Sequence, residues 1–185
     1  MESKVDYGAS GMTICEAMID NANRFPDKDN RPNFIFWNGL HVKTGDRWQV
    51  PELGRVRIKI LSHKKEVEQG IDLRVIKGAV ILAGGEEVSL LRTWADERYE
   101  AVVEYPYFSK SGEMYITNVY KVVLPNGITR EEKWTGNAGF LVESVSSKER
   151  IYRCSYGDAE APDFGSLVFG VTIIPGPCSP TKSSS

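Results

Sequence analysis

The chain contains very few of the residues on which most metal sites and nucleophilic enzymes depend. Among its 185 residues are only two histidines, His41 and His63, and three cysteines, none of them in a Cys-x-x-Cys pair. Structural zinc sites use four Cys or His ligands, so no metal site is predicted. A Gly-rich phosphate-binding loop and a Gly-x-Ser-x-Gly nucleophile elbow are also absent. We therefore expect no metal and no cofactor.

Cysteine and apolar runs are also too scarce for a disulfide-rich or membrane-spanning protein. Cys15, Cys154 and Cys178 are too few, and odd in number, for a disulfide framework. No apolar run approaches the roughly 20 residues that cross a bilayer. The first six residues, Met-Glu-Ser-Lys-Val-Asp, contain no apolar signal segment. These observations favour a cytoplasmic protein with reduced thiols, without a membrane partner.

An excess of positive charge is missing as well. The net charge is −2 and the isoelectric point about 5.8, so no general attraction to nucleic acid is expected. One strand does carry a basic face, formed by Arg55, Arg57 and Lys59. No aromatic residues interleave with it for base stacking, so it is interpreted as a solvated face. Nothing in the sequence decides between a monomer and a homo-oligomer.

One helix is predicted, near residues 13–25. Thr13 and Glu16 have capping-box spacing, which satisfies free N–H groups of the first turn. Apolar residues follow at helical spacing, and Pro26 lies just past the expected end. We expect a flexible lead at 1–9, one domain at 10–175 and a disordered tail at 176–185.

The rest of the chain is predicted to form about ten short strands. Residues 99–134 give the clearest pattern, because Ser111-Gly112 and Asn126-Gly127 separate three β-rich runs, as in a three-stranded antiparallel meander. A sheet of many strands tends to curl closed, which removes its edges. The predicted fold class is all-β with one N-terminal helix, an antiparallel β-barrel of lipocalin-like shape. A β-sandwich is the alternative.

Strand alternation places polar and aromatic side chains together on one face of this stretch. In one interpretation, which assigns these residues no functional role, Arg130 and Glu132 face water on an exposed or edge strand. In the other interpretation they line a binding cavity, where desolvation raises the pKa of a carboxyl group and suits it to acid–base catalysis. The catalytic candidates are Glu132, Tyr120 and Arg130, with Glu104 second to Glu132. The ligand-binding candidates are Tyr105, Tyr107, Asn118, Trp134 and Tyr152.

Two functional hypotheses follow from the sequence. In the first, a β-barrel binds a small hydrophobic or aromatic molecule. Such a protein either only binds it or acts as a cofactor-independent isomerase, cyclase or lyase through proton transfer. In the second, the domain is a non-catalytic protein–protein interaction module with aromatic anchors. Fold class alone does not choose between them.

Overall fold

The structure, a computed structural model, describes residues 5–97 and 101–176. Within them lie one helix, α1 (Ile14–Arg24), and fourteen strands. This confirms a mostly β protein with antiparallel sheets and an N-terminal helix. The described helix is too short and too polar to cross a bilayer. The strands are β1 (Ile35–Trp37), β2 (Leu40–Val42), β3 (Asp46–Gln49), β4 (Leu53–His63), β5 (Gln69–Val75), β6 (Gly78–Ile81), β7 (Glu87–Val88), β8 (Leu90–Trp94), β9 (Val102–Ser109), β10 (Glu113–Val123), β11 (Thr129–Glu132), β12 (Gly139–Ser146), β13 (Glu149–Ser155) and β14 (Leu167–Pro175).

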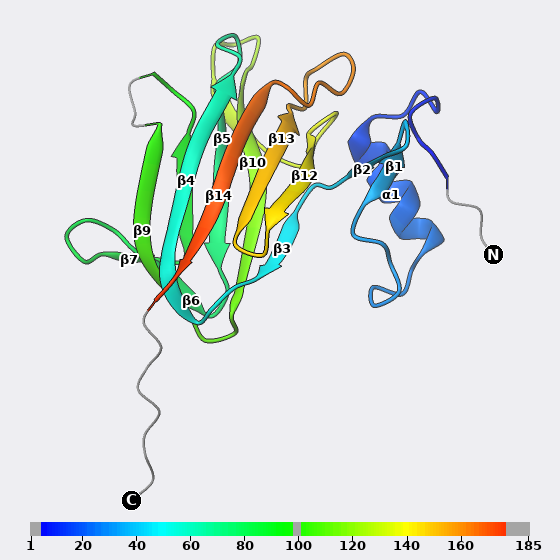
Figure 1. The fold of residues 1–185 in the computed structure, drawn as a ribbon. Coiled ribbons are helices and arrows are strands. Elements are labelled where there is room, and N and C mark those ends of the chain that lie inside the picture. Colours follow the sequence, from blue (N-terminus) through cyan, green and yellow to red (C-terminus); the bar gives the residue numbers. More distant parts are fainter. Residues whose placement is uncertain (1–4, 98–100, 177–185) are drawn as a thin grey trace, which may run out of the picture.

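Two large sheets contain most of these strands and lie as two layers (Figure 1). One has the order β11–β10–β5–β8, with β3 paired to the first part of β10; the other has the order β12–β13–β14–β4–β9–β6–β7. Inward side chains from both sheets form one buried core. The described strands do not close into a single barrel, so the expected lipocalin-like closure is not found.

The core is tightly filled by aromatic and branched side chains. Tyr152 stacks on Phe169 with ring centroids 4.8 Å apart, and Phe140 meets Tyr152 edge-on at 5.5 Å. All three residues are fully buried. Alternation along the strands produces this filling, because every second residue faces the opposite sheet.

The predicted three-stranded meander over 99–134 is wrong in one respect. Strands β10 and β11 pair as expected, but β9 pairs with β4 and β6 in the other sheet. Between β9 and β10 the chain crosses from one sheet to the other at a corner. The Ser109 hydroxyl donates to the Ile76 carbonyl at 2.8 Å, and the Ile76 N–H donates to the Glu113 carbonyl at 3.0 Å. These bonds join that corner to a second crossing between β5 and β6.

The N-terminal unit, residues 5–42, packs at one side of the two sheets (Figure 1). Thr13 caps α1 in the predicted capping box. The Ile14 and Cys15 N–H groups donate to Asn137 Oδ1 at 3.2 Å and to the Gly136 carbonyl at 2.9 Å. The start of the helix is thereby tied to the loop before β12.

Part of the expected flexible lead packs against the rest of this unit. Tyr7 is buried, its N–H donates to the Phe36 carbonyl at 2.9 Å, and its hydroxyl donates to Asp20 at 2.6 Å. Within the expected lead, Tyr7 is therefore packed and hydrogen-bonded. The expected tail lies outside the described residues from position 177 onward, and so does Cys178.

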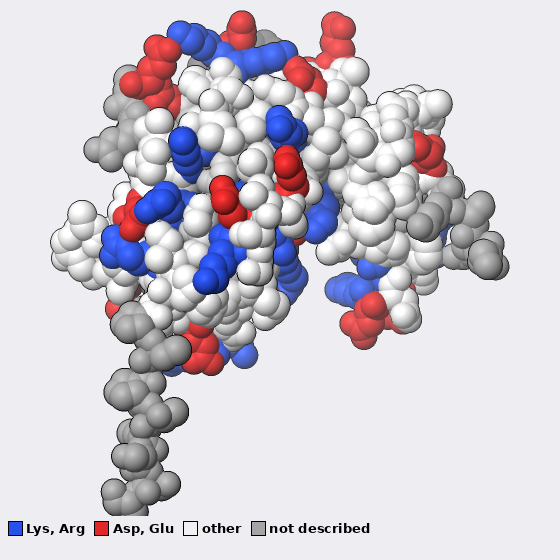
Figure 2. Space-filling view, in the orientation of Figure 1, with Lys and Arg blue, Asp and Glu red and all other residues white. Residues whose placement is uncertain are grey.

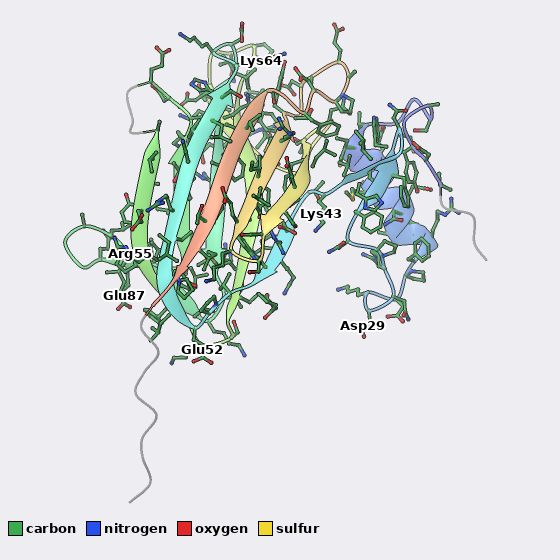
Figure 3. The ribbon with its side chains drawn as sticks, viewed as in Figure 1. Asp29, Lys43, Glu52, Arg55, Lys64 and Glu87 are labelled. Atoms are coloured by element: carbon green, nitrogen blue, oxygen red, sulfur yellow. The ribbon has the colours of Figure 1, made fainter. Side chains whose placement is uncertain are left out.

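A buried carboxylate joins both sheets directly after the N-terminal unit. Asp46, at the start of β3, is fully buried. It accepts hydrogen bonds from Lys43 at 2.7 Å, from Arg150 at 2.6 Å and from the Tyr152 hydroxyl at 2.9 Å. Lys43 lies where the chain passes from the N-terminal unit to the sheets (Figure 3). Because β3 belongs to one sheet and β13 to the other, this carboxylate joins the two sheets to the segment that leads out of the N-terminal unit.

Replacing Asp46 by Asn should lower the free energy of unfolding by about 3–5 kcal/mol, because it leaves two partly buried cations without their counter-charge. Urea denaturation measures the change. The control is Glu143→Gln, since Glu143 is exposed and its only described ion pair, with Arg153, spans 3.9 Å; it should cost less than about 0.5 kcal/mol. Equal costs for the two substitutions would contradict the role given to Asp46.

The chain should lose stability between about pH 10 and pH 12. Burial raises the pKa of both Tyr7 and Tyr107 to about 12, and Asp20 adds to the effect at Tyr7. A tyrosine in an unfolded chain ionises near pH 10, so both groups favour the folded state below that pH and lose this effect as the pH rises to their folded pKa. Melting temperatures at pH 9–12 check this. The alkaline loss should shrink in Tyr7→Phe and Tyr107→Phe, and an unchanged loss in both would refute it.

Candidate functional site

A cleft lies between the N-terminal unit and the outer face of the five-stranded sheet. Its volume is about 330 Å³. Small-molecule sites usually occupy about 300–1,000 Å³, so a compact organic molecule fits. Figure 2 shows the surface notched between the N-terminal unit and the sheets, with Lys or Arg on both sides of the notch. The lining residues are Met18, Asn21, Ala22, Arg31, Pro32, Asn33, Thr44, Gly45, Arg47 and Tyr115.

On the sheet side, a tyrosine ring and an arginine form the wall of the cleft. Tyr115 on β10 and Arg47 on β3 are direct cross-strand partners, and the guanidinium carbon lies 5.8 Å from the ring centroid. Gly45 makes room for the ring, because an added Cβ there would collide with the Tyr115 hydroxyl. Burial raises the pKa of Tyr115, so its hydroxyl stays neutral at physiological pH.

On the other side, the end of α1 supplies both apolar and basic groups. Met18 and Ala22 are four residues apart and share one face of the helix. Arg31 folds back over the end of the helix and donates to the carbonyl groups of Phe25 at 2.8 Å and Ala22 at 3.3 Å. These bonds satisfy free C=O groups and hold the guanidinium at the wall of the cleft.

The charge of the lining is positive. It contains two arginines and no Asp, Glu or His. Arg47 is paired with Glu113 at 2.7 Å, whereas Arg31 has no carboxylate partner among the described residues. Arg74, the exposed cross-strand neighbour of Tyr115 on β5, has none there either. The cleft is therefore suited to an anion that also carries an apolar ring.

Two smaller cavities, of about 240 and 300 Å³, lie together near the end of β4 and share His63. Lys and Glu side chains both line the smaller one, whereas the charged residues of the larger one are Asp96 and Glu97. Across the described ranges, no three His, Cys, Asp or Glu side chains form a group that fits a metal ion. The cleft between the N-terminal unit and the five-stranded sheet, called the junction cleft below, has the largest volume of these three and is taken as the candidate site.

The structure brings the three predicted catalytic residues together, away from this cleft. Tyr120 and Glu132 are direct cross-strand partners, as the Asn126-Gly127 turn predicts, and Arg130 forms an ion pair with Glu132. The Glu132 side chain is 16% exposed and that of Arg130 62%. Tyr120 is buried, and its hydroxyl is hydrogen-bonded to that of Thr135.

The predicted ligand-binding residues are spread over several elements. Three are buried and form hydrogen bonds within the protein. Tyr107 donates to the Pro51 carbonyl at 3.0 Å, Asn118 to the Ser155 carbonyl at 2.9 Å, and Tyr152 to Asp46. Tyr105 packs beside the core and Trp134 is exposed. None of them lines any of the three cavities described above.

Glu104, the second catalytic choice, lies on the outer face of the seven-stranded sheet. It accepts hydrogen bonds from Arg55 and Arg57, both at 2.7 Å. These bonds lower the pKa of the carboxyl group. Glu104 therefore lacks the raised pKa that a general acid needs near neutral pH.

Sequence reasoning missed Arg31, Arg47 and Tyr115. A weak signal existed at Tyr115, which is an aromatic residue on the opposite face of its strand from Met114 and Ile116. Nothing local connects it with Arg31, because the two residues meet only through the docking of the N-terminal unit. No protein-family model matches the chain, and no curated protein or solved structure matches it significantly.

Replacing Glu132 by Gln should leave the melting temperature almost unchanged. Its ion pair is with a mostly exposed arginine, and such pairs contribute about 0–1 kcal/mol. If Glu132 is a catalytic acid or base, turnover of a substrate should nevertheless be abolished. Thermal unfolding measures the first quantity. A loss of more than about 2 kcal/mol would instead show that the carboxylate is part of the structural framework.

Proposed function

We propose that the protein is a two-sheet β-sandwich that binds a small organic anion with a flat apolar ring in the junction cleft. The observation that carries this proposal is the lining itself, with two arginines, an aromatic ring, and no carboxylate. An anion gains charge-assisted hydrogen bonds there, and the apolar part of the ligand gains burial against Met18 and Pro32. The filled space between the sheets favours this external cleft over a ligand inside a barrel.

The residues that line the cleft favour ligand binding without catalysis. General acid–base catalysis needs a group that exchanges a proton near neutral pH. The cleft contains no Asp, Glu or His, and the raised pKa of Tyr115 makes that tyrosine a poor base. The site suits recognition, transport or sequestration of a ligand.

Proton-transfer catalysis is a second candidate, and one observation favours it. Glu132 is largely buried beside Tyr120, which is the pairing an acid–base site on this strand requires. In this proposal Glu132 exchanges the proton and Arg130 positions the ligand. The buried, hydrogen-bonded Tyr120 hydroxyl and the absence of Glu132 from the described cavities make it the weaker of the two.

The fluorescent anion 8-anilinonaphthalene-1-sulfonate, which combines aromatic rings with a sulfonate, tests the proposal. We expect saturable binding to one site, weakened about tenfold in Arg47→Gln because a charge-assisted hydrogen bond is lost. Gly45→Ala should also weaken binding, since the new methyl group displaces the Tyr115 ring. Fluorescence titration of the folded protein provides the affinities.

Two matched variants serve as controls. Arg153→Gln removes a half-exposed arginine from the other sheet, and Gly170→Ala adds a methyl group where the nearest atom lies 4.0 Å away. Both should bind the probe like the unmodified protein. Equal weakening in the controls, or no saturable binding at all, would refute the proposed function.

A further inference from the structure

We infer that the site continues from the junction cleft over the outer face of the five-stranded sheet, and that its ligand is an acidic oligosaccharide. This inference rests on the proposed function and names the class of the anion: a chain of sugar rings carrying carboxylates. It assigns a second subsite to Trp134, Lys133, Asp72 and Arg92, which we call the platform.

The cleft and the platform are directly connected. Thr44 lines the cleft, and its carbonyl accepts a hydrogen bond from the Trp134 indole N–H at 2.9 Å. Lys133 reaches the Asp72 carboxylate at 3.3 Å. Asp72 is the cross-strand partner of Thr117, which lies two residues beyond Tyr115 on β10, a rise of about 7 Å. The platform is thus the next row of side chains after the Tyr115 wall.

Trp134 has the features of a residue held in place for contact with a ligand. It is 45% exposed, although tryptophan is usually largely buried. Its φ of 62° lies in the left-handed region, which is a genuine outlier for a bulky side chain. Such strain tends to occur where function requires a fixed orientation. The bond to Thr44 and the Lys133 ammonium 4.7 Å from the ring centroid fix the indole.

The polar part of the platform is rigid. Arg92 donates to both oxygens of Asp72, at 2.6 and 2.7 Å, and also pairs with Glu131. Burial alone would raise the pKa of Asp72, but Arg92 and Lys133 outweigh it and the pKa is lowered. Asp72 therefore remains a carboxylate, and each group holds its neighbours in position. Side chains fixed in this way recognise a ligand's hydroxyl groups at little entropic cost.

One buried hydroxyl group on this face has no partner. Thr117 is 2% exposed, and its Oγ1 makes no hydrogen bond with any described group. It is the direct cross-strand partner of Asp72, which belongs to the platform. An unsatisfied buried hydroxyl is costly, at about 1–3 kcal/mol, so a small movement of the platform that admits a ligand hydroxyl or a water would relieve it.

The charges on this face argue for a sugar acid over a nucleic acid. The cations are Arg47, Arg74, Arg92, Lys121 and Lys133, and four of them are paired with Glu113, Asp72, Glu131 or Glu68. Only Arg74 on the sheet and Arg31 in the cleft lack a carboxylate partner among the described residues. A dense row of phosphates would find little net attraction, whereas a ligand with one or two carboxylates matches these two unpaired cations.

The aromatic rings supply the remaining contacts. The face of an aromatic ring is electron-rich and attracts the weakly positive C–H groups that line one side of a sugar ring. Tyr115 and Trp134 provide two such rings in successive rows. One sugar ring lies on each, with its carboxylate directed to Arg31 or Arg74 and its hydroxyl groups to the partly exposed Arg92 and Lys133, which the buried Asp72 holds in place.

Calorimetry with galacturonate, digalacturonate and tetragalacturonate tests the inference. In the unmodified protein, affinity should rise at least tenfold from galacturonate to digalacturonate, which has one sugar ring for each aromatic residue, and this gain should be retained in tetragalacturonate. Trp134→Ala should abolish this gain, and Trp134→Phe should keep most of it. The control Phe108→Ala removes a partly exposed ring from the other sheet and should change nothing.

The outcomes separate this inference from the proposed function. Normal binding of the sulfonate probe with no dependence on sugar chain length would overturn the inference and leave the proposed function standing. Cellotetraose, a neutral tetramer, bound as tightly as tetragalacturonate would overturn the assignment to acidic sugars. A single-stranded oligonucleotide bound more tightly than tetragalacturonate would also overturn it. Failure of every probe, the sulfonate included, would refute the proposed function itself.

Discussion

The Asp46 carboxylate is the constraint on which the arrangement of this protein depends. Its two oxygens accept hydrogen bonds from Lys43, Arg150 and Tyr152, and it has no exposed surface. Two cations around one buried acid offset the cost of desolvation that a lone carboxylate would carry. Arg150 also lies 4.5 Å over the ring of Trp48, so the second cation is held from both sides. Charge and aromatic packing thus fix the edge where the sheets and the N-terminal unit meet.

This constraint also shapes the cleft. Thr44, Gly45 and Arg47 flank Asp46 in the sequence and line the cleft wall, so their positions follow from where the carboxylate is held. On the opposite wall, the Asn137 and Gly136 contacts to the start of α1 hold the helix, while Arg31 closes its far end. The cleft is therefore a gap between two separately anchored parts. A gap of this kind stays open because neither wall depends on the ligand for its position.

Local patterns in the sequence predicted the local structure well. Thr13 and Glu16 marked the start of α1, and Asn126-Gly127 set the register that pairs Tyr120 with Glu132. The partner of β9 could not be predicted in this way. Strand patterning specifies which residues face inward but not which sheet a strand joins, and here the interlocked corners at Ser109 and Ile76 decide it.

The candidate site was harder to predict than the fold for a related reason. The predicted residues were chosen because they are aromatic or charged within one stretch of chain, yet Tyr107 and Tyr152 use their hydroxyls to satisfy the core. The cleft residues Arg31 and Tyr115 are 84 positions apart in the sequence, and they meet only after the N-terminal unit docks. Trp134 was selected for its aromatic ring, but no pattern in the sequence indicates its left-handed backbone conformation or its exposure.

The central claim is that the ligand occupies the junction cleft, and methyl NMR of methionine tests it most directly. Met18 lines the cleft, Met114 is fully buried between the sheets, and Met12 is exposed ahead of the helix. With 13C-methyl methionine and 8-anilinonaphthalene-1-sulfonate, we predict that the Met18 methyl signal shifts and shows nuclear Overhauser contacts to the naphthalene protons. The Met114 and Met12 signals should stay in place. Probe contacts to Met12 or Met114 without contacts to Met18 would contradict the account.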